Sequence, residues 1–398
     1  AEPVSPGSTA QFHGDPSTRL PPDVLPSLGC WFWSETEFQP DGYRPFLDLV
    51  GRHSAFNLLT TSLRVPQREV TESAVHEQIG NAANYARQYA MKLVMDLDVR
   101  LARQAFFEAY PDELQEMLRL REIPLDSNDE VVLTISAEVP GDHYTFATTP
   151  YVPVSSRLVR VYLCRETEGQ IDPASVRDIT ARCRVIAATT NTLSVAIPPD
   201  FAGRGQQAIV AAAFAHLTPD VFAPHLIAFQ RRILSQYANL PLAGACKDEW
   251  GFPPSFDGCP AKNDFWFSRN YALAYADRTG GRDLVRDCLL MWRAERGRAQ
   301  ERQAAINHYQ QLAWQRNAAL EDDFHRAVKE TFGPAALVAT HPTWWPNPDL
   351  REFKKNGLHW WAATRDLAQT DEVTPFAVRT ALTKKWGGPL WYNMFYAS

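Results

Sequence analysis

The sequence predicts an α/β fold, a TIM-type (β/α)8 barrel with an inserted antiparallel β-sandwich. In the first and last parts of the chain, short apolar runs alternate with segments of helical periodicity. This alternation is typical of parallel strands joined by helical crossovers. From about residue 130 to 215 the pattern changes to short alternating runs, separated by turn residues such as Pro140-Gly141-Asp142, as antiparallel strands require.

The first strand–helix units follow one another directly. Strands are predicted over residues 28–33, 55–63 and 91–98, and the segments 43–52 and 75–89 between them carry apolar residues at helical spacing. This order favours a parallel sheet, because parallel neighbours need a crossover connection.

A further helix is expected over residues 100–121, with a kink at Pro111. Helical periodicity resumes at residues 219–240 after the sandwich, and residues 265–333 read as almost entirely helical. The remaining strands are predicted to begin at 242 and to cover 335–340, 359–364 and 389–396.

These predictions divide the chain into three parts. Residues 1–127 form the first part of the barrel, with an extended N-terminal arm over 1–27; residues 128–217 form the sandwich; residues 218–398 form the second part of the barrel. Seven strands are visible and the eighth is missing. Because an open barrel leaves strand edges unpaired, the chain is expected to be a fragment or to be completed by another segment. An open doubly wound sheet is the alternative fold.

Composition excludes some classes of partner. The formal net charge of −6 argues against nucleic acid, which requires a basic surface. No apolar run approaches the ~18–20 residues that span a bilayer, so no membrane partner is expected. The 12 tryptophans are more than a core ordinarily needs, and stacking on sugar rings is a common use of indoles.

The chain begins Ala1-Glu2-Pro3 without a starting Met. This resembles a mature end after signal-peptide removal, which predicts a secreted or periplasmic protein, although a trimmed sequence would look the same. No CxxC or HxxxH-type spacing occurs, so neither a metal site nor another cofactor is expected. The oligomeric state is left open.

The stretch from Leu242 to Gly251 is the most informative one. A run of small residues ends in Lys247 and then in Asp248, Glu249 and Trp250. Small residues suit a strand buried on both faces, and parallel α/β folds place their chemistry where such strands end. Glu249 is therefore the leading catalytic candidate. Capping of a following helix by one of the acids is the alternative.

Other predicted strands also end in polar or aromatic residues. A barrel would gather these residues around one pocket, although each alone is also compatible with a capping or structural role. Asp96 and Asp98 alternate, so one should face the pocket while the other caps or pairs with an arginine. The candidates for substrate binding are Trp31, Trp33, Glu35, Arg64, Asp96, Asp98, Trp250, His341, Trp344, Trp345, Arg365, Asp366, Trp391, Tyr392 and Asn393.

Acids and tryptophans without a phosphate-binding loop favour hydrolysis of an oligo- or polysaccharide. That reaction needs a protonated carboxyl at the leaving oxygen and an ionised carboxylate opposite it. A carboxyl beside Trp250 would have its pKa raised by loss of solvation, as a general acid requires.

The strand order and the Glu after the fourth strand resemble clan A glycoside hydrolases. The Thr340-His341-Pro342 and Trp391 segments are most similar to the family that includes thermophilic β-galactosidases. The resemblance is distant and covers most of residues 28–398 outside the sandwich. It implies that Glu249 is the acid/base, although the clan usually has Asn before this Glu and this chain has Asp248.

The second carboxylate departs from that pattern. The clan places its nucleophile, a Glu, after the seventh strand, and residues 390–398 contain no Glu. Asp371 and Glu372 are the candidates instead, with Asp366 a weaker one because it is expected to pair with Arg365; the remaining alternative is a base beyond Ser398. A glycan-binding protein without catalytic activity is the alternative function. A metal-dependent hydrolase of amidohydrolase type is a third, but the Trp31-Phe32-Trp33 run lacks the HxH pair of that class.

Overall fold

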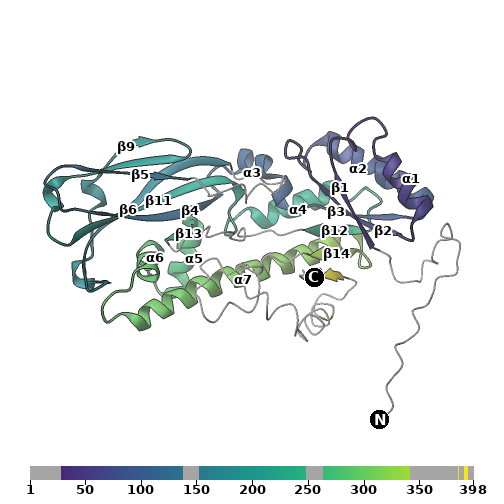
Figure 1. Ribbon diagram of the computed structural model, residues 1–398. Coiled ribbons are helices and arrows are strands. Elements are labelled where there is room, and N and C mark those ends of the chain that lie inside the picture. The colour runs from purple at the N-terminus through teal and green to yellow at the C-terminus, as the bar shows by residue number, and fades with distance from the viewer. Residues whose placement is uncertain (1–27, 138–151, 248–262, 341–383, 385–389, 393–398) are drawn as a thin grey trace, which may run out of the picture.

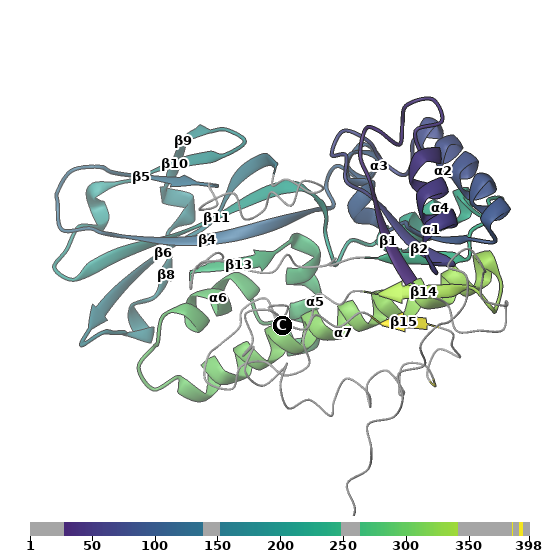
Figure 2. The same ribbon diagram turned by 45° about the vertical axis from the view of Figure 1, so that its right-hand side comes forward.

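The computed structural model describes residues 28–137, 152–247, 263–340, 384 and 390–392. Figures 1 and 2 show a parallel half-barrel sheet at one end of the molecule and a β-rich part at the other. The long helix α7 (Ala299–Phe332) runs beneath both. The fold is thus mixed α/β, and its two parts share one helix.

The half-barrel is a six-stranded parallel sheet in which the strands follow their order in the chain. Sequential order is expected where helical crossovers join neighbouring strands, and α1 (Arg44–His53) and α2 (Ser73–Ala86) are the first two. The strands are β1 (Leu28–Trp33), β2 (Leu58–Leu63), β3 (Lys92–Asp96), β12 (Gly244–Lys247), β14 (Leu337–Thr340) and β15 (Leu390–Tyr392).

A complete barrel is not seen in the described part of the chain. Within those residues β1 pairs only with β2. At the other end β15, the predicted seventh strand, pairs directly with β14, with Val338 beside Leu390. The predicted strand 359–364 lies outside the described residues. The described residues thus show a half-barrel, and the complete barrel stays a prediction.

The expected helix over residues 100–121 is wrong for most of its length. The 3-10 turn η2 (Val99–Leu101) and the short helix α3 (Arg103–Ala109) are followed by a strand, β4 (Leu114–Pro124). Residues 114–120 are all buried. Three of them, Gln115, Glu116 and Arg119, are polar, so the segment has no clear apolar pattern that would distinguish a strand buried on both faces from a helix.

The β-rich part is a sandwich of two antiparallel sheets. Alternate residues of β11 face opposite sides: Val210 and Phe214 pack between the sheets, whereas Ile209 and Ala213 belong to the main core. One sheet has the order β13 (Asp264–Phe267), β4, β11 (Gln206–Pro219), β6 (Pro153–Thr167) and β7 (Gln170–Ile171), with β8 (Arg177–Asp178) beside β6. The other has β5 (Val131–Ser136), β10 (Thr192–Ile197) and β9 (Arg184–Ala188).

The predicted sandwich is therefore present, but its larger sheet also includes β4 and β13, which extend beyond residues 128–217. Those limits stay a prediction. Short 3-10 turns, η1 (Arg87–Tyr89), η4 (Pro173–Ser175), η5 (Thr180–Arg182) and η6 (Pro199–Phe201), complete the connections.

Helix α7 links the sandwich to the half-barrel. Near its start it packs on α5 (Arg269–Thr279) and α6 (Leu284–Trp292), and the Tyr309 hydroxyl donates to the carbonyl of Trp266 at 2.8 Å. Farther along it packs on α4 (Leu226–Gln236) and on β12 and β14. Among the described residues, no helix is both long and apolar enough to cross a bilayer.

The two faces of the half-barrel sheet differ. One packs into the main core, where Trp31 and Trp33 of β1 join Leu59, Leu93 and Ala245. The other face carries a small apolar cluster of Leu58, Val94 and Cys246. Because side chains alternate along a strand, every second residue of each strand lies on the same face as this cluster. We call this second face the inner face.

Trp33 allows a direct test of the core. Its side chain is fully buried, so Trp33→Ala should lower the free energy of unfolding by about 3–5 kcal/mol, measured by chemical denaturation and circular dichroism. Leu49→Ala on α1 is the matched control, because that side chain is 60% exposed and its loss should cost less than about 0.5 kcal/mol. Equal stability of the two variants would contradict the packing described.

Candidate functional site

A row of residues crosses the inner face near the carboxyl ends of the strands. Phe32 of β1 lies beside Ser62 of β2, and Asp96 of β3 lies beside Cys246 of β12. The Ser62 hydroxyl donates to Asp96 Oδ2 at 2.6 Å, which joins the two halves of the row. Residues in register on parallel strands share a face, so these side chains belong to one surface.

The centre of this row is a buried charged cluster. Arg100 Nη2 donates to Asp96 Oδ2 at 2.6 Å, and Arg100 Nε donates to Asp98 Oδ2 at 3.3 Å. The exposed fractions are 1% for each aspartate and 8% for Arg100. Burial of charges is costly unless they are paired and hydrogen-bonded, and here the guanidinium balances carboxylates from the end of β3.

The loop after β3 is fixed by its own hydrogen bonds. Asp98 caps η2 by accepting from the Arg100 backbone N–H at 2.7 Å. Gln230 of α4 donates to the Leu97 carbonyl at 2.8 Å and accepts from the Val99 N–H at 3.1 Å. The sequence assigned one aspartate to the pocket and one to a cap or ion pair; the structure has Asp98 as the cap, while both pair with Arg100.

A second buried ion pair lies at the end of β12. Lys247 Nζ is 2.9 Å from Glu321 Oε1 on α7, and His325 Nε2 is 3.6 Å from Glu321 Oε2. Burial would raise the pKa of Glu321, but the Lys247 ammonium and His325 more than offset it and lower this pKa to about 2. Burial lowers the pKa of His325, although Glu321 opposes the shift.

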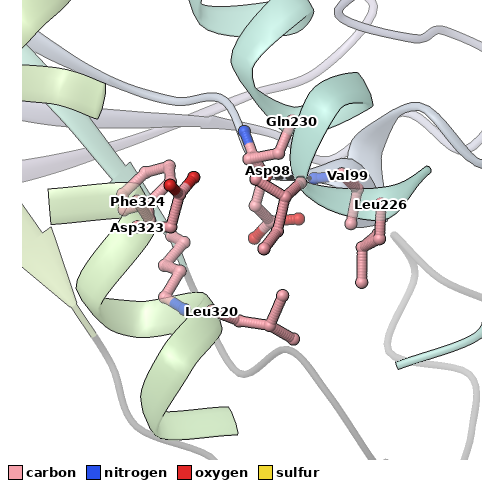
Figure 3. Close-up of a pocket in the computed structure, with 9 residues that line it drawn as sticks. Asp98, Val99, Leu226, Gln230, Leu320, Asp323 and Phe324 are labelled. Carbon is pink, nitrogen blue, oxygen red and sulfur yellow. Dashed lines mark hydrogen bonds between the residues drawn. The ribbon is translucent and has the colours of Figure 1, made fainter. Parts of the chain in front are cut away.

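A small pocket lies between these two clusters (Figure 3). Its walls come from η2, α4, β12 and α7, and its cavity volume of about 20 Å³ leaves room for about one water molecule. Asp98 and Lys247 bring charge to it, while Leu226, Leu320 and Phe324 supply apolar surface. The pocket as described is too small for a sugar ring.

Trp31 and Trp33 do not belong to this site. They are 2% and 0% exposed, and Trp31 stacks on Phe46 of α1 with ring centroids 4.8 Å apart. Both indoles point into the core because they alternate with Phe32 along β1. Their predicted role as sugar-stacking surfaces is corrected to a role in packing.

Glu35 and Arg64 lie at the expected strand ends but have different neighbours. Glu35 is exposed, and its hydrogen bond from Arg68 at 2.8 Å lowers its pKa. The Arg64 guanidinium lies 4.5 Å from the centre of the Phe32 ring, on the inner face. Arg64 therefore lies at the β1 end of the row, next to Phe32, whereas Glu35 is not part of the row.

The other candidates are not placed. Trp391 and Tyr392 belong to β15, where Trp391 pairs with Ala339 of β14; their side chains are outside the description. The described residues contain no group of His, Cys, Asp or Glu that could hold a metal ion. The candidates that lie outside the described residues are Glu249, Trp250, His341, Trp344, Trp345, Arg365, Asp366, Asp371, Glu372 and Asn393.

The sequence analysis missed Ser62, Lys247 and Glu321. Ser62 follows two threonines in β2, one residue before a predicted strand end, and nothing in the sequence distinguishes it from them. Lys247 directly precedes the acidic pair that drew attention. Glu321 and His325 are four residues apart on a helix, a spacing that places them on one face and could have marked them as a pair.

Glu321 should control stability at low pH. A carboxyl whose folded pKa lies below its unfolded value of about 4.3 stabilises the fold above that value and stops doing so as pH falls toward 2. Wild type should therefore lose about 3 kcal/mol over that interval through this group, and Glu321→Gln should be less stable at pH 7 with a flatter pH profile. Chemical denaturation at several pH values measures both.

Glu330→Gln on the same helix is the matched control, since the Glu330–Arg231 pair is solvent-exposed at 60% and 37%. Its effect should stay below about 1 kcal/mol at pH 7. If Glu321→Gln behaves like Glu330→Gln, the buried pair does not contribute as described.

Comparisons with known proteins assign no family. No family model matches the chain, and no curated protein matches it. Among solved structures, a rhamnosidase from Novosphingobium sp. PP1Y matches with a TM-score of 0.32 and 9% identity, over 80% of this chain and 46% of that one. This chain thus spans about half the length of that enzyme. At this TM-score the likeness assigns neither a family nor an activity to it.

Proposed function

We propose that this chain hydrolyses a glycosidic bond in an oligo- or polysaccharide, with Glu249 as the general acid/base. The supporting observation is the pairing of β12 with β3, which sets Cys246 beside Asp96. β12 ends at Lys247, two residues before Glu249. β12 therefore ends next to the Asp96–Arg100 cluster, at the edge where parallel folds carry their active sites.

The groups around Glu249 have separate roles in this proposal. Trp250 would remove water from the Glu249 carboxyl and favour its protonated form. Asp96 and Asp98 already engage Arg100, so they suit the orientation of hydroxyl groups better than proton transfer. Asp371 or Glu372 would supply the ionised carboxylate opposite Glu249.

A glycan-binding protein without catalysis is the second candidate. It is favoured by the same engagement of Asp96 and Asp98, because at the strand ends that the structure describes both carboxylates are held by Arg100. Such a protein would use these groups for recognition alone.

Removal of the proton donor tests the enzyme hypothesis. Glu249→Gln should lower kcat by about 100- to 10,000-fold while sugar binding and melting temperature stay unchanged, measured on a panel of aryl glycosides and polysaccharides. Glu77→Gln, at an exposed position of α2, is the control and should keep full activity. Full activity of Glu249→Gln on a genuine substrate would remove Glu249 from the mechanism. Binding without cleavage by wild type would favour the glycan-binding protein.

The second carboxylate can be found by comparing two variants. If Asp371 or Glu372 acts opposite Glu249, one of Asp371→Asn and Glu372→Gln should lose activity by about the same factor as Glu249→Gln. The other should stay near wild type, and rate assays with an aryl glycoside measure both. Full activity of both variants would place the second carboxylate elsewhere.

A further inference from the structure

Phe32 differs in exposure from the two tryptophans beside it in β1. The neighbouring side chains Trp31 and Trp33 are 2% and 0% exposed, whereas the Phe32 ring is 56% exposed. The alternation of a strand explains the difference, because successive side chains point to opposite faces. Phe32 is thus an exposed aromatic residue on the inner face. It occupies the role of a sugar-stacking residue that was predicted for the two tryptophans.

The position of Phe32 relates it to the candidate site. It lies beside Ser62, which donates to Asp96 on the next strand. Adjacent strands are about 4.8 Å apart, so the backbones of Phe32 and Asp96 are separated by about 10 Å across the sheet. A ligand of sugar size over Phe32 would thus lie next to the charged cluster rather than on a remote surface.

Arg64 gives the aromatic ring a polar neighbour. Its guanidinium lies 4.5 Å from the ring centre, within the range of a cation–π contact. The Arg64 backbone N–H donates to the Trp33 carbonyl at 2.8 Å, which holds the backbone of Arg64 against the end of β1. With the guanidinium over one face of the ring, Phe32 and Arg64 together offer apolar aromatic surface and fork-shaped N–H donors, which matches a ligand that has both C–H groups and hydroxyls.

We propose that Phe32, flanked by Arg64, is the stacking surface for a sugar ring at the β1 end of the inner face. The C–H face of the sugar packs on the phenyl ring, and hydroxyls at its rim accept from Arg64. This inference rests on the proposed function for the class of ligand. The inference adds to the proposed function that the sugar is recognised by Phe32 and Arg64, which take no part in proton transfer.

The test measures binding of carbohydrate to the full chain. Wild type is first surveyed by affinity electrophoresis against soluble neutral and acidic polysaccharides, and the tightest member is then titrated by calorimetry. Phe32→Ala should raise its Kd about tenfold, the loss of one aromatic contact. Phe32→Tyr, which keeps the ring, should stay within about twofold of wild type.

Phe56→Ala is the matched control. Phe56 is also an exposed phenylalanine, at 42%, but it precedes β2 and so lies at the opposite, amino end of the sheet. Its removal should leave Kd unchanged, and melting temperatures show whether all variants fold. Equal Kd for wild type and Phe32→Ala, or equal losses in Phe32→Ala and Phe56→Ala, would overturn the inference.

The outcomes also separate this inference from the proposed function. If wild type binds and cleaves sugar and Phe32→Ala has the same Kd as wild type, only the stacking role of Phe32 is overturned. A loss of binding in Phe32→Ala together with full activity of Glu249→Gln supports the stacking role and overturns the proposed acid/base. A wild type that binds no polysaccharide overturns both.

Discussion

The pairing of β3 with β12 is the constraint on which the rest depends. These strands are adjacent in the sheet, yet a sandwich and α4 lie between them in the chain. Their register sets Cys246 beside Asp96 and lets the Leu97 N–H donate to the Cys246 carbonyl at 3.1 Å. It therefore determines that β12 ends beside a buried cluster of two carboxylates and a guanidinium.

Helix α7 holds this arrangement from the other side of the sheet. Lys247 has the same strand parity as the core residue Ala245, opposite to that of Cys246, and its ammonium meets Glu321 on the helix. The same helix reaches back to the sandwich through Tyr309 and Trp266. A buried ion pair contributes more to specificity than to net stability in some proteins, and here it ties the end of β12 to one turn of one helix.

Much of the half-barrel was predictable because its periodicity is clear: β1 has the predicted bounds, and β2, β3 and β14 lie within the predicted ranges. The strand β4 was not predictable, because a strand buried on both faces lacks the alternation of apolar and polar residues.

Which side chains of β1 lie on which face of the sheet was harder to predict. The position of Trp31 and Trp33 at a strand end predicted a role in the site, but the packing of α1 against Trp31 puts both indoles in the core and Phe32 on the inner face. The Lys247–Glu321 pair joins residues far apart in the chain, so a local sequence pattern could not predict it.

The most direct test of the shared strand-end site is a crystal structure of the Glu249→Gln chain with a bound oligosaccharide fragment. We expect the sugar on the inner face at the carboxyl ends of the strands, with one ring over Phe32 and the Gln side chain within about 3 Å of a glycosidic oxygen. A sugar bound on the sandwich, or a residue 249 that points away from the sugar, would contradict this account.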